Sequence, residues 1–378
     1  MANATSCTGF LLTSPFSPFV RLPIKLKPFT ENDIDIEITH CGVCNTDCTT
    51  LLSAKTYPLC VGHEIIGRAI KVGSKVKGVK YWDRVGVGPI VSSCGLCSVC
   101  LSGEENYCEK VIATYDDVYP DGTETTGGFA SHVRVHQNFV FLLPSNLDPT
   151  NVAPMLCGGL SVFSPMRRHK VSKGTKIGII GLAGLGHLAI LFARALGAEG
   201  AYFLSPANSS LFFITACRKR QRCTKGKTFS IFGASVFICT HNIDWSDRWV
   251  RRLDIILNTS NIGSLFPEPY LRLLKPHGTY ITLGFPENGL PTIASVDLIH
   301  SGISIEGSRS GSRRDMVSML KLAAKAKLKS WVDEVEISEE GCRTAIERVR
   351  NGEARYRVVL VGHVKAFNKP PGEDRHLL

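Results

Sequence analysis

The fold of this 378-residue chain is decided by one stretch, Ile177-Gly178-Ile179-Ile180-Gly181-Leu182-Ala183-Gly184-Leu185-Gly186. Its first four residues form a short apolar run, and its glycine-rich turn leads into an apolar segment that ends at Leu196, just before Gly197. A glycine-rich hexamer is informative only between a strand and a helix, and the pattern here predicts both. We therefore expect the free N–H groups at the start of the helix to bind a pyrophosphate.

Similar apolar runs recur after about residue 155 and alternate with helical stretches. They lack period-two alternation, which is typical of strands covered on both faces in a parallel βαβ sheet. The predicted strands are Ile177–Ile180, Ala201–Leu204, Val236–Cys239, Leu253–Leu257, Thr279–Leu283 and Ile303–Ile305. The segment 177–198 is long enough for a membrane span, but it contains His187, Arg194 and several glycines, so we interpret it as strand plus helix.

The first third of the chain has a different pattern. Apolar residues alternate with polar ones in Val20–Leu26 and Ile34–Ile38, which predicts strands with one solvated face. Further predicted strands are Glu64–Val72, Arg84–Val87 and Phe129–Val135. We expect a β-rich domain with long loops. The C-terminal part adds predicted helices at Arg313–Lys327 and Glu339–Asn351 and a strand at Tyr356–Leu360.

Composition indicates a globular protein, with 44% hydrophobic and 20% charged residues. The formal net charge of +11 is uneven, because no carboxylate lies between Glu199 and Asp244. About half of the excess positive charge is concentrated there, in Arg218, Lys219, Arg220, Arg222, Lys225 and Lys227. The 14 cysteines of a long chain without a secretory signal favour reduced thiols, so we expect a cytoplasmic protein.

Four cysteines lie close together, at Cys94, Cys97, Cys100 and Cys108. Thiolates at such spacings wrap one tetrahedral Zn²⁺ in a closed site, which would be structural. An iron–sulfur cluster is the competing prediction, although ferredoxin spacings end with three residues and a proline. Reduced or disulfide-linked cysteines are the remaining alternative.

A second set of metal ligands is scattered along the chain. It comprises the string Cys41-Gly42-Val43-Cys44-Asn45-Thr46-Asp47, the triplet Gly62-His63-Glu64, and Cys157. Each part alone is weak evidence for a metal site, because single histidines and cysteines are usually buried in cores. Together they offer the Cys, His and Cys ligands of a catalytic zinc with an open position. Asp47 would orient His63 by accepting its second ring N–H.

These motifs, in their order and spacing, resemble the zinc-dependent medium-chain alcohol dehydrogenases. Within that family the chain resembles the cinnamyl-alcohol-dehydrogenase branch and its NADP-dependent relatives, through Glu105-Asn106-Tyr107-Cys108, Gly127-Gly128-Phe129-Ala130, Ser164-Pro165-Met166 and Arg355-Tyr356-Arg357. The resemblance covers roughly Pro28–Leu360. It implies a GroES-like β-rich catalytic domain, residues 1–156 and 306–378, and a Rossmann doubly wound NADP-binding domain, residues 157–305.

The resemblance also implies an activity and its residues. Two zinc ions per chain and NADP(H) would serve the interconversion of primary alcohols and aldehydes, cinnamyl or aromatic ones among them, in a homodimer. Cys44, His63 and Cys157 would bind the catalytic zinc, with Glu64 as a neighbouring carboxylate. Thr46 would take the proton of the alcohol. The residues expected on the nicotinamide side are Ser161, Thr259, Gly284, Ser308, Arg309 and Ser310.

The glycine-rich turn favours NADP over NAD. An acidic residue about twenty positions on would hold the adenine ribose of NAD, and the segment after Leu204 has none. Ser205 is therefore expected to bond a 2′-phosphate. The expected pyrophosphate contacts are Gly181, Ala183, Gly184, Leu185 and Gly186. Ala183 occupies the second glycine position of the fingerprint, which predicts weakened cofactor binding.

Several positions depart from the family. Ser209–Ser230 does not resemble it and is about ten residues longer than expected, while Thr49 stands where a relay histidine is common and Trp82 where relatives use glycine. One alternative is thus a folded zinc-binding relative with impaired cofactor binding. Another is a basic nucleic-acid-binding zinc module, which is disfavoured because Cys94–Cys108 and Arg218–Lys227 lie in different predicted domains. We expect a small-molecule substrate, no nucleic acid and no membrane.

Overall fold

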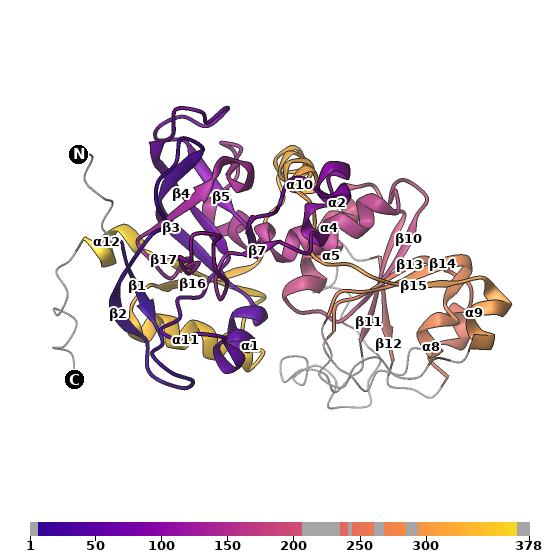
Figure 1. Ribbon diagram of the computed structural model, residues 1–378. Coiled ribbons are helices and arrows are strands. Elements are labelled where there is room, and N and C mark those ends of the chain that lie inside the picture. The colour runs from indigo at the N-terminus through magenta and orange to yellow at the C-terminus, as the bar shows by residue number, and fades with distance from the viewer. Residues whose placement is uncertain are drawn as a thin grey trace. The chain divides into compact units, whose positions relative to one another are not determined.

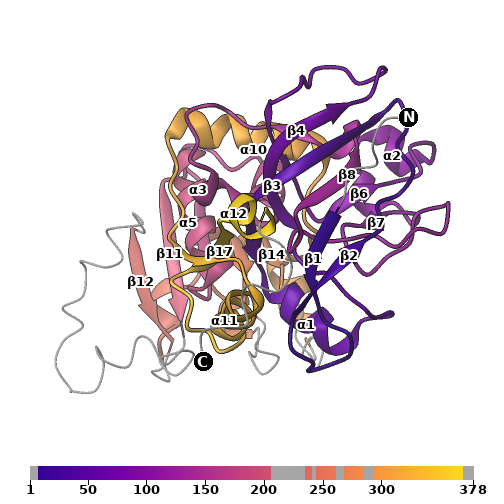
Figure 2. The same ribbon diagram turned by 90° about the vertical axis from the view of Figure 1, so that its left-hand side faces the viewer.

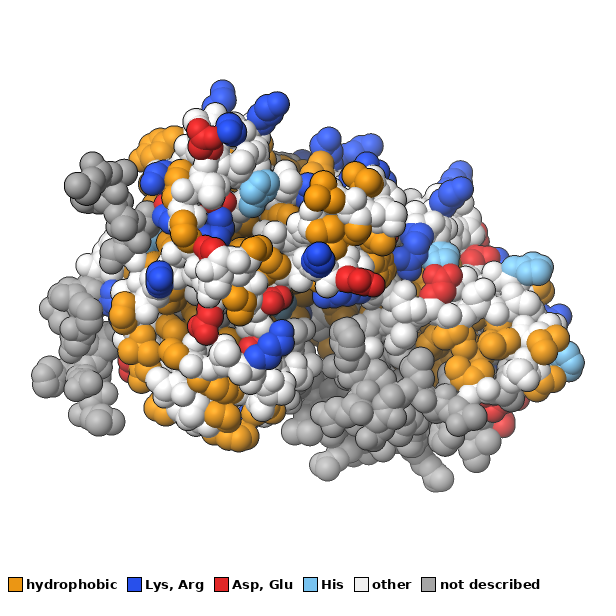
Figure 3. All heavy atoms as spheres, viewed as in Figure 1, with side chains coloured by type: hydrophobic (Ala, Val, Ile, Leu, Met, Phe, Trp, Pro, Cys, Tyr) orange, Lys and Arg blue, Asp and Glu red, His pale blue; other side chains and the backbone are white. Residues whose placement is uncertain are grey.

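The computed structural model describes residues 7–205, 235–240, 244–260, 268–284, 293 and 295–368. The chain divides into two compact units (Figure 1): Met1–Cys157 with Ser312–Leu378, and Gly158–Gly311. Both Ser209–Ser230 and Arg218–Lys227 lie outside the described residues. On the face shown in Figure 3, Lys and Arg side chains stand in several separate groups with Asp and Glu among them. Among the described helices, none has the length and apolar character needed to cross a bilayer.

The first unit is built on a seven-stranded sheet of order β16-β17-β3-β4-β5-β9, with β8 paired to β3. Its strands are β3 (Asp33–Val43), β4 (Glu64–Val72), β5 (Arg84–Val87), β8 (His132–His136), β9 (Phe141–Leu142), β16 (Val332–Glu336) and β17 (Arg357–Val361). Its helices are α1 (Asn45–Ser53), α2 (Ser98–Ser102), α3 (Pro149–Val152), α10 (Arg313–Ala326), α11 (Glu339–Arg350) and α12 (His363–Phe367). Two strands, β6 (Ile90–Ser92) and β7 (Ile112–Ala113), form a separate pair.

The strand β3 lies at the centre of this unit and pairs with β4, β8 and β17. Its apolar side chains Ile34, Ile36 and Ile38 are fully buried in the main core. The prediction that its other face is solvated is wrong, because Asp33 and Asp35 are fully buried as well. Lys27 lies 2.6 Å from Asp33, and Arg134 binds Asp35 through two guanidinium nitrogens at 2.6 and 2.9 Å. A paired carboxylate can therefore take an inward position that alternation alone assigns to solvent.

The N-terminal segment forms a strand that sequence analysis did not predict. The strand β1 (Cys7–Leu11) pairs antiparallel with β2 (Val20–Ile24), and Figures 1 and 2 show the two side by side. Phe10 is 2% exposed and its ring lies 5.2 Å from that of Phe367 in α12. This contact joins the two ends of the described chain within one core.

The second unit contains a six-stranded sheet of order β12-β11-β10-β13-β14-β15, in which every neighbouring pair is parallel. This order is that of the Rossmann-type, doubly wound sheets. The strands are β10 (Lys176–Ile180), β11 (Gly200–Ser205), β12 (Val236–Cys239), β13 (Leu253–Asn258), β14 (Leu274–Thr282) and β15 (Ser304–Gly307). The helices are α4 (Gly158–Arg168), α5 (Gly184–Ala195), α8 (Glu268–Leu271) and α9 (Ser295–Ser301).

The apolar segment 177–198 is a strand followed by a helix, as predicted. Ile177, Ile179 and Ile180 of β10 are fully buried, and so are Leu188 and Ile190 of α5. Figure 1 shows α5 on one side of the sheet and α8 and α9 on the other. Strands covered on both faces lose the alternation of an exposed sheet, which is why continuous apolar runs mark them in the sequence.

Candidate functional site

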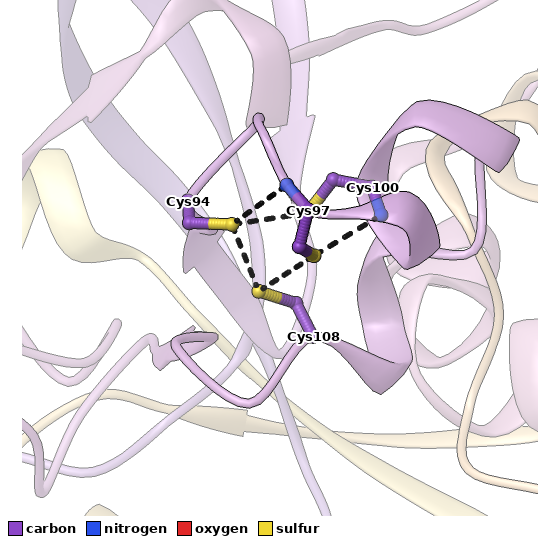
Figure 4. Close-up of side chains that lie close together, drawn as sticks. All are labelled: Cys94, Cys97, Cys100 and Cys108. Carbon is purple, nitrogen blue, oxygen red and sulfur yellow. Dashed lines mark hydrogen bonds between the residues drawn. The ribbon is translucent and has the colours of Figure 1, made fainter.

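The four cysteines of the Cys94–Cys108 loop converge on one point (Figure 4). The sulfurs of Cys94 and Cys100 are 3.8 Å apart, those of Cys97 and Cys108 are 3.9 Å apart, and those of Cys94 and Cys108 are 3.6 Å apart. None of the four is in a disulfide. Sulfurs bound to a single zinc at about 2.3 Å stand about 3.8 Å apart at the corners of a tetrahedron.

This spacing favours zinc over an iron–sulfur cluster. In a four-iron cluster each cysteine binds its own iron, so the sulfurs lie farther apart than the edge of a single-ion tetrahedron. Backbone N–H groups also point at the sulfurs, from Cys97 to Cys94 at 3.4 Å and from Lys110 to Cys108 at 3.3 Å. Hydrogen bonds from the backbone of Leu96 and Cys97 lower the pKa of Cys94 to about 6, which favours the thiolate that a metal binds.

The loop is fastened to the start of α10. Glu105 is only 2% exposed, and its carboxylate accepts hydrogen bonds at 2.5 and 3.1 Å from the backbone N–H and Nε of Arg313. The side chain of Arg314 covers Gly103, where an added Cβ would lie 2.8 Å from the guanidinium carbon. These contacts with the Cys94–Cys108 loop hold the start of α10, where the chain re-enters the first unit after Gly311.

The scattered ligands are brought together in a second cluster. One ligand atom from each of Cys44, His63, Glu64 and Cys157 lies within 4.8 Å of all the others. Cys44 precedes α1, His63 precedes β4, and Cys157 follows a short 3₁₀ turn at the end of the first unit. The His63 Nε2 atom is 3.2 Å from the Cys157 sulfur. Two soft sulfurs, an imidazole and a carboxylate make a donor set suited to zinc.

Asp47 positions two members of this cluster, Cys44 and His63, through hydrogen bonds. Its carboxylate accepts a hydrogen bond at 2.8 Å from the backbone N–H of Cys44 and so caps α1. It also accepts one at 3.1 Å from the backbone N–H of Gly62, and it lies 3.1 Å from His63 Nδ1. Because a carboxylate only accepts, Nδ1 carries the proton, and Nε2 faces the other ligands.

Gly62 can be no other residue without strain. Its φ of +104° lies in the left-handed region, and an added Cβ would stand 2.7 Å from the sulfur of Cys41. That contact also places Cys41, which is fully buried in β3 and stands outside the metal-binding groups formed by the described residues. Cys44, and not Cys41, is the cysteine that joins His63.

Cys44 and Cys157 change each other's pKa. A hydrogen bond from Cys157 lowers the pKa of Cys44 well below its ordinary value, and the same bond raises the pKa of Cys157. Burial opposes protonation of His63, but the charge and hydrogen bond of Asp47 outweigh it and raise the pKa of the imidazole well above its usual range. The cluster thus holds negative charge on sulfur that a divalent cation would neutralise.

Glu64 is paired with Arg357, a residue that sequence analysis did not select as functional. Both are nearly excluded from solvent, and the guanidinium of Arg357 donates to the Glu64 carboxylate. Burial raises the pKa of Glu64 to about 8, while the charge of Arg357 acts to lower it. The other Glu64 oxygen, Oε2, is buried with no hydrogen-bond partner among the described residues, so it is available to a cation.

Tyr115 is a second residue that sequence analysis missed. Its hydroxyl lies 3.3 Å from His63 Nδ1, and burial, followed by the charge of Asp47, raises its pKa well above the ordinary value. A tyrosine seven residues past the last loop cysteine gives no signal of its own. Only the fold shows that the chain after β7 returns to His63.

The expected proton-transfer residue lies at the edge of the cluster. Thr46 is exposed on the first turn of α1, and its hydroxyl is 3.8 Å from the Cys44 sulfur. Thr49, also exposed, donates its hydroxyl to the backbone oxygen of Thr46 at 3.1 Å.

The glycine-rich turn of the second unit has the tight geometry that its sequence predicts. Gly181 has a φ of +90°, and an added Cβ on Gly186 would lie 1.9 Å from the Gly181 carbonyl oxygen. Ala183 caps α5 in an extended conformation, and Gly184 and Leu185 begin the helix. Among the described residues, no side chain caps this helix start, so its N–H groups can bind a ligand.

The other expected cofactor residues gather at the carboxyl ends of the strands. Gly181 follows β10, Thr259 follows β13, Gly284 follows β14 and Ser308 follows β15. The strand order reverses between β10 and β13, and there the Thr259 hydroxyl lies 2.7 Å from the Ile180 oxygen and 3.1 Å from that of Gly181. Ligands of open α/β sheets bind at this reversal point.

Three hydroxyl oxygens at this edge are buried without a hydrogen-bond partner among the described residues: those of Thr282, Ser308 and Ser310. Buried hydroxyls normally have partners, so these three are available to bind a polar ligand. Arg309 is exposed between two of them, and Ser161 lies half-buried in α4. Ser205 ends β11, but its side chain is outside the described residues.

Two family models match the chain. The alcohol dehydrogenase GroES-like domain matches residues 30–145, and the zinc-binding dehydrogenase domain matches residues 184–325. Among curated relatives, the NADP-dependent alcohol dehydrogenase 6 of Saccharomyces cerevisiae is 36% identical over 349 residues, which cover 90% of this chain and 92% of the relative.

Solved structures of the same fold include two cinnamyl alcohol dehydrogenases. The enzyme SbCAD4 of Sorghum bicolor has a TM-score of 0.87 at 29% identity, with 97% of this chain and 100% of that chain covered. The Helicobacter pylori enzyme, solved in complex with NADP(H), has a TM-score of 0.82 at 28% identity, with coverage of 96% and 99%.

Proposed function

Because the chain belongs to the zinc-binding alcohol dehydrogenases, we propose that it interconverts primary alcohols and aldehydes by hydride transfer with NADP(H). The observation that carries this proposal is the convergence of Cys44, His63 and Cys157 from three distant segments. Two thiols and an imidazole gathered at one point are not required for packing, but they fit zinc with an open coordination position. Zinc bound there would polarise the oxygen of an alcohol or aldehyde as a Lewis acid.

The protein's own residues supply the remaining parts of the reaction. Thr46 carries a hydroxyl 3.8 Å from the Cys44 sulfur and is exposed, so it can pass a proton between the substrate oxygen and water. Asp47 fixes the His63 ring through Nδ1. Arg357 balances the charge of Glu64 next to the cluster.

The proposed cofactor is NADP(H). The glycine turn and the start of helix α5 offer N–H groups to a pyrophosphate. The hydroxyls of Ser308 and Ser310, which have no partner within the described part of the chain, offer hydrogen bonds to a polar ligand. No carboxylate lies between Glu199 and Asp244, so the sequence after β11 does not repel a 2′-phosphate. The names of the yeast relative and the Helicobacter structure both include NADP.

We also propose a homodimer in the cytoplasm. Family membership supports the dimer, which sedimentation would test directly. The described cysteines are all free, which supports a reducing compartment for a chain with 14 of them.

Aldehyde reduction by the zinc-loaded protein tests the activity. We expect cinnamaldehyde to be reduced with NADPH and at least about tenfold less efficiently with NADH. Thr46→Val should lower kcat about 100-fold or more, because it removes the proton-transfer group. Thr49→Val, on the same helix and equally exposed, is the matched control and should retain activity. A protein that binds two zinc ions but oxidises no NADPH with any aldehyde would contradict the proposal.

A further inference from the structure

The hydroxyl of Tyr115 lies beside the metal ligand His63, although Tyr115 is not itself one of the ligands. Tyr115 is only 6% exposed, and its ring centroid lies 5.6 Å from that of His63. Its hydroxyl oxygen is 3.3 Å from His63 Nδ1, the nitrogen that faces away from the other ligands. The tyrosine lies just after β7, far in sequence from both His63 and Asp47.

His63 Nδ1 therefore faces two oxygens from separate segments. Asp47 in α1 provides one at 3.1 Å, and Tyr115 provides the other at 3.3 Å. Because Nδ1 carries the proton, the phenol oxygen of Tyr115 accepts at this contact and leaves its own O–H to donate elsewhere.

Asp47 in turn receives three donors: the backbone N–H groups of Cys44 and Gly62 and the ring Nδ1–H of His63. Both of its oxygens are bonded, so the Asp47 side chain is held firmly in place. A carboxylate held in this way has one position relative to the His63 ring.

We propose that Tyr115 is a positioning residue for the metal ligand His63, an inference that rests on the zinc site of the proposed function. Asp47 alone fixes which nitrogen carries the proton, but a ring held at one contact can still turn about it. A second oxygen at Nδ1 fixes the plane of the imidazole. The Nε2 lone pair then points at the position shared with the Cys157 sulfur, which is 3.2 Å away.

Metal release tests this role without a turnover assay. Tyr115→Phe keeps the buried ring and removes only the hydroxyl, so the fold should be retained. Partners of metal-binding histidines typically contribute 10–100-fold in metal affinity, so we expect one of two zinc ions to be released at about tenfold lower chelator concentration. In Co²⁺-substituted protein the visible bands of the Cys44–His63–Cys157 site should shift. The zinc of the Cys94–Cys108 loop should be unaffected.

Tyr119→Phe is the matched control, since Tyr119 lies in the same loop and its ring contacts Lys27 at 5.5 Å. It should release both zinc ions as the wild type does. If Tyr115→Phe does not fold, Thr50→Val, which changes a side chain next to the Tyr115 hydroxyl, should produce a smaller shift in the same direction. Wild-type release from Tyr115→Phe would overturn this inference alone. A wild-type chain holding zinc only in the Cys94–Cys108 loop would overturn the proposed function as well.

Discussion

Glu64 and Arg357 are 293 residues apart in sequence and form a buried ion pair beside the Cys44–His63–Cys157 cluster. Their strands, β4 and β17, lie on either side of β3, where Gly42 pairs with Glu64 on one side and with Val359 on the other. An added Cβ on Gly42 would stand 2.0 Å from the Glu64 Oε2 atom. Because Gly42 has no side chain, the Glu64 carboxylate has room beside β3.

Arg357→Met should destabilise the protein. It leaves the buried Glu64 carboxylate without its cationic partner, and breaking such a pair costs about 3–5 kcal/mol. The pKa of Glu64, which burial raises and the charge of Arg357 lowers, should rise further, because the charge that lowers it is lost. Chemical denaturation of the zinc-loaded protein measures the change. In the double variant with Glu64→Gln, most of the lost stability should return, and an equally unstable double variant would contradict the pairing.

Removing one thiol of the Cys94–Cys108 loop should cost both metal and stability. We expect Cys97→Ser to bind one zinc ion fewer than the wild type and to melt at a clearly lower temperature, because metal binding at closed sites is folding free energy. Cys239→Ser, at a half-buried cysteine in β12 outside both clusters, is the control and should keep all its zinc. Equal zinc contents for the two variants would rule out a metal in this loop.

His363 makes stability depend on pH. Its ring is buried, and its Nε2 atom lies 3.1 Å from the Gly128 oxygen. Burial lowers the pKa of His363 from its ordinary 6.5 to about 3. Between these values the unfolded chain binds a proton that the folded chain does not, so stability falls as the pH falls from about 6.5 to about 3. This contribution is absent above pH 6.5 and amounts to at most about 5 kcal/mol at low pH.

His363→Gln keeps a donor for Gly128 but cannot titrate. Its unfolding free energy should therefore fall less steeply with decreasing pH than that of the wild type, as measured by urea denaturation between pH 7 and pH 4. The exposed His300→Gln is the control. Parallel curves for the His363 variant and the wild type would mean that His363 is protonated in the fold.

Trp82→Gly should stabilise the first unit. Trp82 is 51% exposed and adopts a φ of +72°, a left-handed conformation that costs a bulky residue about 1–2 kcal/mol. The variant loses the contact of the Arg68 guanidinium with the indole, at 5.9 Å, worth about 0.5–1 kcal/mol at an exposed site. The net gain should be about 0.5–1 kcal/mol. Tyr81→Gly, at a neighbouring exposed residue without positive φ, should lower the melting temperature instead.

Strands with regular patterns were predictable from the sequence. Arg84–Val87 and Val236–Cys239 have the bounds that their apolar runs indicate. The burial of Asp33 and Asp35 was not predictable, because it depends on Lys27 and Arg134, which reach them only in the folded sheet. Alternation shows which residues share a face, but it does not show whether that face meets water or a counter-ion.

The candidate site was also predictable only in part. Cysteines and a histidine at metal-ligand spacings indicate a metal site from the sequence alone, because few other chemistries use such a combination. Arg357 and Tyr115 serve the same cluster, but arginine and tyrosine occur everywhere, and their positions follow from strand pairing and from the path of the loop after β7. Groups that support metal ligands are therefore seen only once the fold is known.

The proposed function requires that Cys44, His63 and Cys157 hold one catalytic metal ion, separate from that of the Cys94–Cys108 loop. Zinc analysis of the purified chain and of Cys157→Ser measures whether they do. We predict two zinc ions per chain in the wild type and one in the variant, together with loss of NADPH-linked aldehyde reduction and a retained fold. A variant that still holds two zinc ions, or a wild type that holds one, would contradict the account.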